Sequence, residues 1–422
     1  MSAPVADLTF PWDDFDAPDP IAALDEARGL HGDTFVVESG GDRYLFVFSP
    51  DALRAFYSLP EQVASKGLAD YRMLLRKLPK ELFATRRTFA HDLFGAQEVE
   101  GYLGHLDVAV DRQVRELGDG GTLDVFELSR RLGHRLALGC WMGDAAADAP
   151  MLDRLIREFD QLDGADAFVH PEDMLSAHDD LDVVPFARER AALAQVEEIV
   201  AGLLADGAPE DGFLAEIADR WADVDEGQRA RGVAGDVVLL HIATMTNLFA
   251  ALGWTLGLLL LHPDAKVRVE VGDSAFLERC ELEAIRLGQR SIMMRSVLTP
   301  CSITAGNVEH PLDPGMIVAT MVPLTNRTAA PGLDTYDPDR WDGRRLRDEA
   351  TLPARELVTT FGHGSHRCPA QRFSLSAIGR AVSRLVTTFE LEPAFTAIRP
   401  LPLQIGGVAR PAHPCLVGYR RR

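Results

Sequence analysis

The decapeptide FGHGSHRCPA, residues 361–370, places one cysteine behind two glycines and two histidines and directly before a proline. Gly362 and Gly364 allow tight backbone turns that residues with a Cβ resist. Pro369 suits the first turn of a helix, so Cys368 is expected at the mouth of a helix. Unpaired N–H groups and the positive end of the helix dipole stabilise an anion there. The stretch therefore favours a thiolate at Cys368.

Several roles for this thiol stay open at the level of the decapeptide. A thiolate that accepts backbone N–H groups is suited to binding haem iron from one side. His363, His366 and Cys368 could instead be three zinc ligands, although no fourth candidate stands nearby and the chain has no second Cys/His pair. The other possibilities are a nucleophile that needs a histidine partner, a redox sensor, and a buried cysteine in a glycine-rich turn.

The composition is that of a large globular protein. The 422 residues are 46% hydrophobic and 25% charged, which is enough to bury a large core. The net charge of −21 argues against general binding to nucleic acid or to an anionic membrane, which needs basic surface. The five cysteines are scattered, with no CxxC pair, which fits a reducing cytoplasm. The N-terminal segment has neither the basic region nor the apolar region of a secretory signal.

One uncharged apolar stretch, residues 237–261, is long enough to cross a bilayer. His241, Thr244, Thr246 and Asn247 cluster in its first half, and acidic residues flank it where a membrane span usually has lysine and arginine. A helix that is apolar all round is also typical of the centre of a large helical protein. We therefore expect a buried helix and no membrane span.

The remaining pattern predicts a mainly α fold with a minor β part. Residues 35–48 are expected to form two strands joined at a Gly-Gly turn. The segment from about 82 to 290 has apolar residues mostly at three- and four-residue spacing, as in helices. Residues 292–324 are β-like again. The last helix is expected at 369–387, where proline suits the first turn.

The β-rich parts, approximately residues 30–60 and 292–345, come from both ends of the chain, and the helical part is the remainder. We find no internal repeat and no low-complexity linker. This interleaving favours one domain over residues 1–422.

Two further motifs precede the cysteine. Glu283 and Arg286 form an E-x-x-R pattern on a predicted helix, and residues 338–341, PDRW, resemble a P-x-R-[FW] pattern. An E-x-x-R pattern alone means little, because the chain contains it also at 127–130 and 226–229. Most such pairs are solvated helix charges. The order of several motifs along the chain is therefore more informative than any one of them.

Together these motifs resemble the cytochrome P450 family of haem-thiolate enzymes. The family's cysteine-loop pattern FxxGxxxCxG stands here as Phe361, Gly364 and Cys368, with Ala370 in place of the last glycine. The E-x-x-R motif at 283–286 lies at the family's usual distance before the cysteine. The resemblance covers nearly the whole chain. It implies a single-domain cytochrome P450 fold, with heme b (iron protoporphyrin IX) bound through Cys368 as the metal ligand.

The resemblance also implies a buried structural network. In the family, the arginine of the third motif joins the glutamate and arginine of the E-x-x-R helix. In this sequence these residues are Glu283, Arg286 and Arg340. Buried charges must be paired to be tolerated, so the set is expected to be structural rather than catalytic.

Further cofactor-binding residues follow from the same resemblance. Arg87 matches a W/H-x-x-x-R pattern whose arginine holds a haem propionate, although Phe83 takes the place of the hydrogen-bonding aromatic residue. Arg295 occupies the second propionate position, and His366 is the third implied contact. Phe361 is implied to lie against the haem.

The chain departs from the family on the distal side of the haem. The motif A/G-G-x-D/E-T falls on residues 243–247, so Thr246 replaces the acid and Asn247 replaces the threonine. In the family that pair helps deliver protons to iron-bound dioxygen. An asparagine amide donates a hydrogen bond but does not readily relay protons. Thr246 and Asn247 are the candidate catalytic residues, and the alternative is that Asn247 only satisfies a main-chain group.

The implied function is a monooxygenase that oxidises a small-molecule substrate with dioxygen. Electrons would come from a separate ferredoxin or flavodoxin-type donor, for which Arg367, Arg372 and the Arg86/Arg87 pair could form a basic docking patch. Asparagine at position 247 resembles the pattern of the branch that holds prostacyclin synthase and sterol 7α-hydroxylases. The alternative function is therefore a haem-thiolate isomerase, dehydratase or peroxygenase without dioxygen activation. A non-catalytic haem carrier or gas sensor is the third hypothesis.

The substrate pocket is expected to be lined by four segments, residues 61–82, 243–247, 291–294 and 404–408. These are largely apolar, which favours a medium-sized hydrophobic compound. The basic stretch KLPK, residues 77–80, and the nearby arginines could instead hold a carboxylate.

Overall fold

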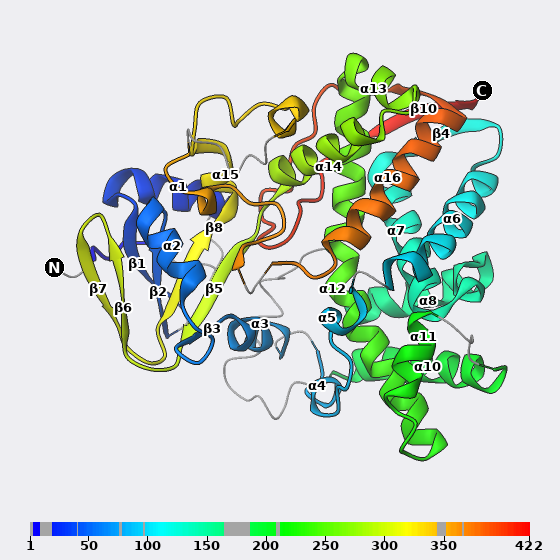
Figure 1. The fold of residues 1–422 in the computed structure, drawn as a ribbon, viewed down its shortest axis with the longest axis horizontal. Coiled ribbons are helices and arrows are strands. Elements are labelled where there is room, and N and C mark those ends of the chain that lie inside the picture. Colours follow the sequence, from blue (N-terminus) through cyan, green and yellow to red (C-terminus); the bar gives the residue numbers. More distant parts are fainter. Residues whose placement is uncertain are drawn as a thin grey trace.

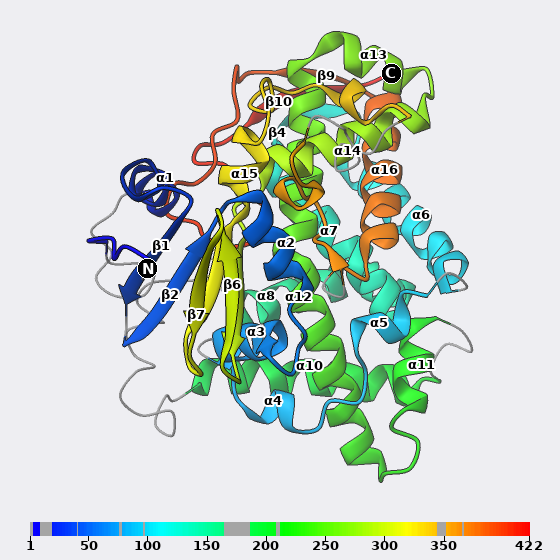
Figure 2. The ribbon, with the colours of Figure 1, turned by 60° about the vertical axis from the view of Figure 1, so that its left-hand side comes forward.

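The described residues form a helical body with a β-rich lobe at one end (Figure 1). The computed structural model describes residues 3–8, 19–39, 41–75, 78–95, 98–163, 186–207, 212–343, 352–364 and 367–422. The N-terminus lies at the β-rich lobe and the C-terminus at the opposite end, beside the helices (Figure 2). The predicted fold class, mainly α with minor β, is confirmed.

The larger sheet of the lobe joins strands from both halves of the chain. Its order is β1 (Thr34–Ser39), β2 (Asp42–Val47), β8 (Ile317–Met321), β5 (Ile292–Val297) and β3 (Ala64–Ser65). Only β2 and β8 are parallel neighbours, and the other pairs are antiparallel. The expected strand pair over residues 35–48 is therefore present, and it meets the second β-rich segment at β8.

A separate hairpin, β6 (Cys301–Ala305) and β7 (Val308–Leu312), extends from this lobe. Its turn residues Gly306 and Asn307 both have positive φ, as a two-residue turn that follows the strand twist requires. A third sheet at the far end of the molecule pairs β4 (Gly120–Asp124), β10 (Leu416–Arg421) and β9 (Phe389–Pro393).

Helix α12 (Glu226–Leu261) is the centre of the helical body. Asp225 caps its N-terminus by accepting a hydrogen bond from the Gln228 N–H, and the helix ends at Leu261, with His262 as its C-cap directly before Pro263. It is long and apolar enough to cross a membrane, but 72% of its most apolar window is buried inside the structure. That burial agrees with the expected core helix.

Two glycines let α12 approach helix α7 (Val125–Met142) closely. A Cβ added to Gly133 of α7 would lie 2.1 Å from the ring of Phe249 on α12. A Cβ added to Gly253 of α12 would lie 2.6 Å from the ring of Phe126 on α7. Each helix therefore has a glycine, without a Cβ, at the point where an aromatic ring of the other helix packs against it. This reciprocal packing fixes the position of the helix that carries residues 243–247.

Helices α14 (Ser274–Gly288), α16 (Gln371–Thr388), α6 (Glu98–Leu117) and α10 (Ala187–Ala205) complete the body around α12. Shorter or more peripheral helices are α1 (Pro20–His31), α2 (Pro50–Ser58), α3 (Lys66–Leu75), α4 (Glu81–Ala84), α5 (Ala90–Leu93), α8 (Ala149–Leu162), α11 (Phe213–Asp219), α13 (Pro263–Glu270) and α15 (Val322–Thr328).

The structure differs from the expected elements at two boundaries. The β-like segment predicted to reach residue 324 ends at Met321, because Pro323 lies in the first turn of a short helix, α15. The last helix begins at Gln371 rather than at Pro369, since residues 369 and 370 form a turn after the cysteine. Both shifts are of two to three residues and leave the site in place.

Candidate functional site

A cavity of about 350 Å³ lies between the middle of α12 and the cysteine loop. All four segments expected to line the pocket contribute side chains, namely Lys66, Ala243, Thr244, Asn247, Ser291, Met293 and Val408. Cys368 and Phe361 line the same cavity. The sequence analysis did not anticipate the contribution of Thr359, Thr360 and Ile378, which lie before the loop and on α16.

Hydrogen bonds hold the cysteine loop in a fixed shape. The Cys368 N–H donates to the Phe361 carbonyl over 2.7 Å, closing the loop on itself. Gly362 and Gly364 have φ of 79° and 61°, which L side chains rarely adopt, and this explains the two glycines of the motif. Upstream, the Thr359 hydroxyl accepts the Gly362 N–H over 2.7 Å.

The electrostatics of Cys368 combine burial with positive neighbours. Burial raises the pKa of the Cys368 thiol, while the Ala370 N–H and the charges of Arg367 and Lys66 act in the opposite direction. A single thiol with a backbone donor, facing a largely apolar cavity, is suited to binding a metal from one side. Among the described residues, no group of three or more His, Cys, Asp or Glu side chains could hold a metal ion.

The zinc alternative proposed from the decapeptide gains no support from His363. The ring of His363 is buried, its Nε2 lies 3.1 Å from the Val358 carbonyl, and it meets Tyr57 edge-on at 5.0 Å. His366, the third residue of that set and an implied propionate contact, lies outside the described residues. Its role stays a prediction.

Helix α12 presents a short exposed stripe to the cavity. Between Gly232 and Leu260, all of which the structure describes, only Ala243 and Asn247 are exposed. They are four residues apart and therefore lie on one face of the helix. Asn247 Oδ1 accepts the Val408 N–H over 3.1 Å. Thr244 also lines the cavity, and its hydroxyl donates to the Leu240 carbonyl over 2.8 Å.

Thr246 does not join Asn247 in this cavity. It lines a second, outer cavity of about 740 Å³, together with Met245, Phe249 and polar residues of α7 and α8. The reason is geometric, because successive residues of an α-helix point about 100° apart. A catalytic role of Thr246 stays a prediction, and the hydroxyl beside Asn247 in the cavity is that of Thr244.

The buried network expected from the second and third motifs is present. Glu283 and Arg286 are fully buried and form a bidentate pair, with N–O distances of 2.9 and 2.8 Å. Arg340 Nε donates to the same carboxylate over 2.9 Å, and Trp341 Nε1 donates over 3.0 Å. The Asp337 N–H completes the shell at 3.1 Å. Each oxygen of the Glu283 carboxylate thus accepts at least two hydrogen bonds from the protein. This agrees with the expected structural role of the set.

Arg87 and Arg295 lie outside the lining of the cavity. The Arg87 guanidinium forms an ion pair with Asp223 and lies 4.3 Å from the ring centre of Trp221. Arg295, on β5, is 1% exposed, and its Nε donates to the Ala64 carbonyl over 3.1 Å. Their contact with a propionate stays a prediction.

Lys66 is the cation that the sequence analysis missed. It begins α3, directly after β3, and lines the cavity that contains Cys368. Its ammonium forms an ion pair with Asp70, one helical turn on. The pocket was expected to include residues 61–82, but the cations singled out there belonged to residues 77–80. A lysine at a strand-to-helix junction carries no sequence signal that distinguishes it from a solvated one.

Comparison with known proteins agrees with this geometry, although no family model matches the chain. The human protein named 24-hydroxycholesterol 7-alpha-hydroxylase is 22% identical over 438 residues, which cover 96% of this chain and 90% of the relative. The sterol 14alpha-demethylase of Mycolicibacterium vanbaalenii is 25% identical over 357 residues, covering 77% of this chain and 75% of the relative.

A solved structure supports the fold over the full length. The retinoic acid-bound cyanobacterial CYP120A1 matches with a TM-score of 0.76 at 18% identity, over 100% of this chain and 99% of the other. All three proteins are cytochrome P450s, and the two sterol enzymes are a hydroxylase and a demethylase. The resemblance inferred from the cysteine loop and the E-x-x-R helix is confirmed.

Proposed function

The chain belongs to the cytochrome P450 family, and from this premise we propose that it is a haem-thiolate monooxygenase that oxidises a medium-sized hydrophobic compound with dioxygen. One observation carries the proposal: the Cys368 thiol faces a largely apolar cavity, with the Ala370 N–H and the Lys66 charge nearby. This arrangement combines an iron ligand with a binding site for an organic molecule.

The residues around Cys368 fit haem b. The Cys368 sulfur would hold the iron, and Phe361, Ala251 and Ile378 offer apolar walls to the porphyrin. Lys66 is a cation in the same lining that could pair with a propionate. When bound, the haem would supply dioxygen activation, with the thiolate ligand favouring O–O cleavage.

The side chains of α12 would bind and orient the substrate. Ala243 and Ala251 leave room beside the helix, and the burial of its neighbours excludes water from the other faces. Thr244 and Asn247 are the polar groups that α12 offers to the cavity. The Thr244 proton is directed to the Leu240 carbonyl, so its oxygen is available as an acceptor in this arrangement.

The names of the relatives favour a lipid-like substrate. Two relatives act on sterols by name, and the structural neighbour has retinoic acid bound. We therefore propose an isoprenoid or steroid skeleton as the substrate class. A screen of such compounds on the haem-loaded protein, read as a change of the Soret band, tests this. Binding of short polar compounds in preference to every steroid and isoprenoid would contradict it.

Asn247 favours a second candidate, a haem-thiolate isomerase, dehydratase or peroxygenase that needs no electron donor. It faces the cavity where most of the family has threonine, and its amide does not readily relay protons. Turnover with cumene hydroperoxide alone should be compared with turnover with dioxygen, NADPH and a surrogate reductase. Product only in the second reaction supports the monooxygenase, and product only in the first supports the alternative.

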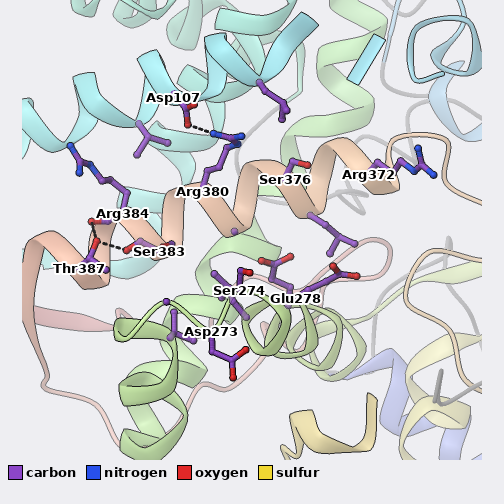
Figure 3. Close-up of a pocket in the computed structure, with 18 of the residues that line it drawn as sticks. Asp107, Asp273, Ser274, Glu278, Arg372, Ser376, Arg380, Ser383, Arg384 and Thr387 are labelled. Carbon is purple, nitrogen blue, oxygen red and sulfur yellow. Dashed lines mark hydrogen bonds and ion pairs between the residues drawn. The ribbon is translucent and has the colours of Figure 1, made fainter. Parts of the chain in front are cut away.

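A ferredoxin or flavodoxin-type donor would dock on the face of α16 that continues from the cysteine loop. A groove of about 1250 Å³ runs along this face between α6 and α14 (Figure 3). Arg380 and Arg384 are paired there with Asp107 and Asp111 of α6. Arg372 has no ion-pair partner among the residues that the structure describes, so its charge is available to an acidic protein.

The docking proposal is tested by Arg372→Ala. We expect slower reduction of the haem by the donor, with a steeper loss at low salt and no change in substrate affinity. Arg43→Ala, which removes the same charge from the distant β-rich lobe, is the control. Equal reduction rates for the two variants would move the docking site away from α16.

The haem-thiolate assignment itself is tested by Cys368→Ser. We expect the absorption band that marks a thiolate-bound carbon monoxide complex to disappear, because serine does not supply a thiolate. Cys301→Ser, in the β6–β7 hairpin, should keep the band. If both variants give the band of the unchanged protein, Cys368 is not the ligand.

A further inference from the structure

The cavity side of α12 is tied to a turn at the far end of the sequence. Asn247 Oδ1 accepts the Val408 N–H over 3.1 Å. The contact is so close that a Cβ added to Gly407 would lie 2.7 Å from that oxygen. Gly407 also has φ of 63°, a conformation that L side chains rarely adopt. The sequence around residue 407 is therefore fitted to the Asn247 side chain.

Hydrogen bonds also join the turn to the segment that follows α14. Main-chain groups of Arg290 accept the Gly406 N–H and donate to the Gly407 carbonyl, each over 2.8 Å. The Gln404 amide nitrogen bridges the Gly406 and Val408 carbonyls at 3.0 Å each. These bonds fix the internal shape of the turn. They do not attach it to α12.

Two side chains of α12 make that attachment. Trp254 Nε1 donates to the Ala409 carbonyl over 2.6 Å, two turns further along the helix, where both groups are buried. Asn247 is the attachment at the cavity, because Asn247 and Val408 both line it. Removing the Asn247 oxygen would leave the Val408 N–H without its acceptor, while the Trp254 contact would hold only the end of the turn away from the cavity.

The hydrogen bond also fixes which way the amide faces. A main-chain N–H needs an acceptor, so Oδ1 and not Nδ2 must face Val408. The shorter side chains common in the family at this helix position could not make the same contact without moving the turn. Asparagine is thus the residue that reaches the turn and offers it an acceptor.

We propose that Asn247 is a positioning residue that holds the 404–408 turn against α12 and thereby sets one wall of the ligand cavity. This gives the asparagine a role that does not depend on proton delivery. The effect on ligands rests on the proposed function, whereas the attachment of the turn does not. The two parts can therefore fail separately.

The attachment is tested by hydrogen–deuterium exchange of the peptide that contains residues 404–409. Asn247→Leu keeps the size of the side chain and removes the acceptor, and it should speed exchange there about fivefold, the effect of losing about 1 kcal/mol. Asn247→Asp keeps an oxygen acceptor and should exchange at the rate of the unchanged protein. Thr246→Ala, which faces the outer cavity, is the control on the same helix.

A substitution in the turn tests the same contact with Asn247. Gly407→Ala places a methyl group against Asn247 Oδ1 and should loosen the same peptide. Because alanine at φ of 63° is strained whatever its neighbour, this variant should loosen the peptide more than Asn247→Leu does. Unchanged exchange in Asn247→Leu would overturn the proposal.

The effect on the cavity wall is read on the haem-loaded protein with imidazole and 4-phenylimidazole. The ratio of their dissociation constants measures how the cavity accepts a bulky group. Asn247→Leu should change this ratio at least threefold, and Asn247→Asp should not. An unchanged ratio beside faster exchange would overturn the link to ligand binding, and failure to load haem would count against the proposed function and leave the exchange result standing.

Discussion

Helix α14 carries two buried glutamates in opposite situations. Glu283 is fully buried and meets Arg286, Arg340, Trp341 and a main-chain N–H. Glu281, two residues earlier, is 2% exposed, and its Oε2 has no hydrogen-bond partner among the described residues. The first faces the loop that leads to the cysteine, and the second faces α16.

The difference teaches that burial alone does not reveal how a charge is tolerated. Arg286, the partner of Glu283, donates further to the Asn326 and Leu333 carbonyls over 2.6 Å each, so hydrogen bonds enclose the whole pair. Burial, and to a lesser degree the neighbouring Glu278, raises the pKa of Glu281 well above its ordinary value. One glutamate is therefore enclosed by hydrogen-bond donors, whereas burial disfavours the charged form of the other.

The largest effect is expected from Glu283→Gln. The neutral amide would leave the buried Arg286 without its counter-charge, and removing one partner of a buried pair costs about 3–5 kcal/mol. Denaturant unfolding measures this loss. Glu278→Gln, on the exposed side of the same helix, should stay within about 0.5 kcal/mol of the unchanged protein. Similar values for both variants would mean that the network contributes no stability.

Glu281→Gln should have the opposite sign, and the effect should depend on pH. Because the folded pKa of Glu281 is raised, folding favours the protonated form, and this stability is lost as pH rises above the ordinary pKa of about 4.3. Glutamine carries no proton to lose. We expect the variant to be more stable than the parent by at least about 1 kcal/mol at pH 8 and nearly equal at pH 4.

Thermal unfolding across this pH range checks the Glu281 prediction. A stability difference between Glu281→Gln and the parent that is the same at pH 4 and pH 8 would show that folding does not raise the pKa of the Glu281 carboxyl. The comparison between the two faces of α14 would then lose its basis.

The smallest effect is expected at Lys66, which pairs with Asp70 and for which we propose a haem propionate as a further partner. Lys66→Met should weaken haem binding by the apoprotein about fivefold, since a partly exposed ion pair contributes up to about 1 kcal/mol. Lys66→Arg should restore it, and Lys80→Met, an exposed lysine nearby, should have no effect. Titration of apoprotein with haem measures all three. Equal affinity for Lys66→Met and Lys80→Met would remove Lys66 from the site.

The features that the sequence predicted well depend on residues that lie close together in the chain. The Glu283–Arg286 pair is one turn of one helix, and the cysteine loop needs glycines at fixed φ, so both leave a local pattern. The buried helix at 237–261 followed from its composition, because no polar face could meet water.

The direction of individual long side chains could not be predicted in the same way. Arg87 matches a family pattern, but its guanidinium is bound to Asp223, 136 residues further along the chain. Lys66 reaches the cavity although no motif marks it. The bond between Asn247 and Val408 spans 161 residues and involves a main-chain group, which every residue type except proline offers. Such contacts depend on tertiary placement and leave no local signature.

The separation of the two cavities by α12 has a consequence for protein engineering. Ala243, Asn247 and Ala251 border the inner cavity, whereas Thr246 and Ala250 border the outer one. Combinatorial libraries at the first set would change the cavity that contains Cys368, and libraries at the second set would change the cavity lined by Thr246. The two sets share no lining residue, but Thr246 adjoins Asn247 and Ala250 adjoins Ala251 in the same helix, so changes from the two libraries are expected to couple and need to be tested in combination.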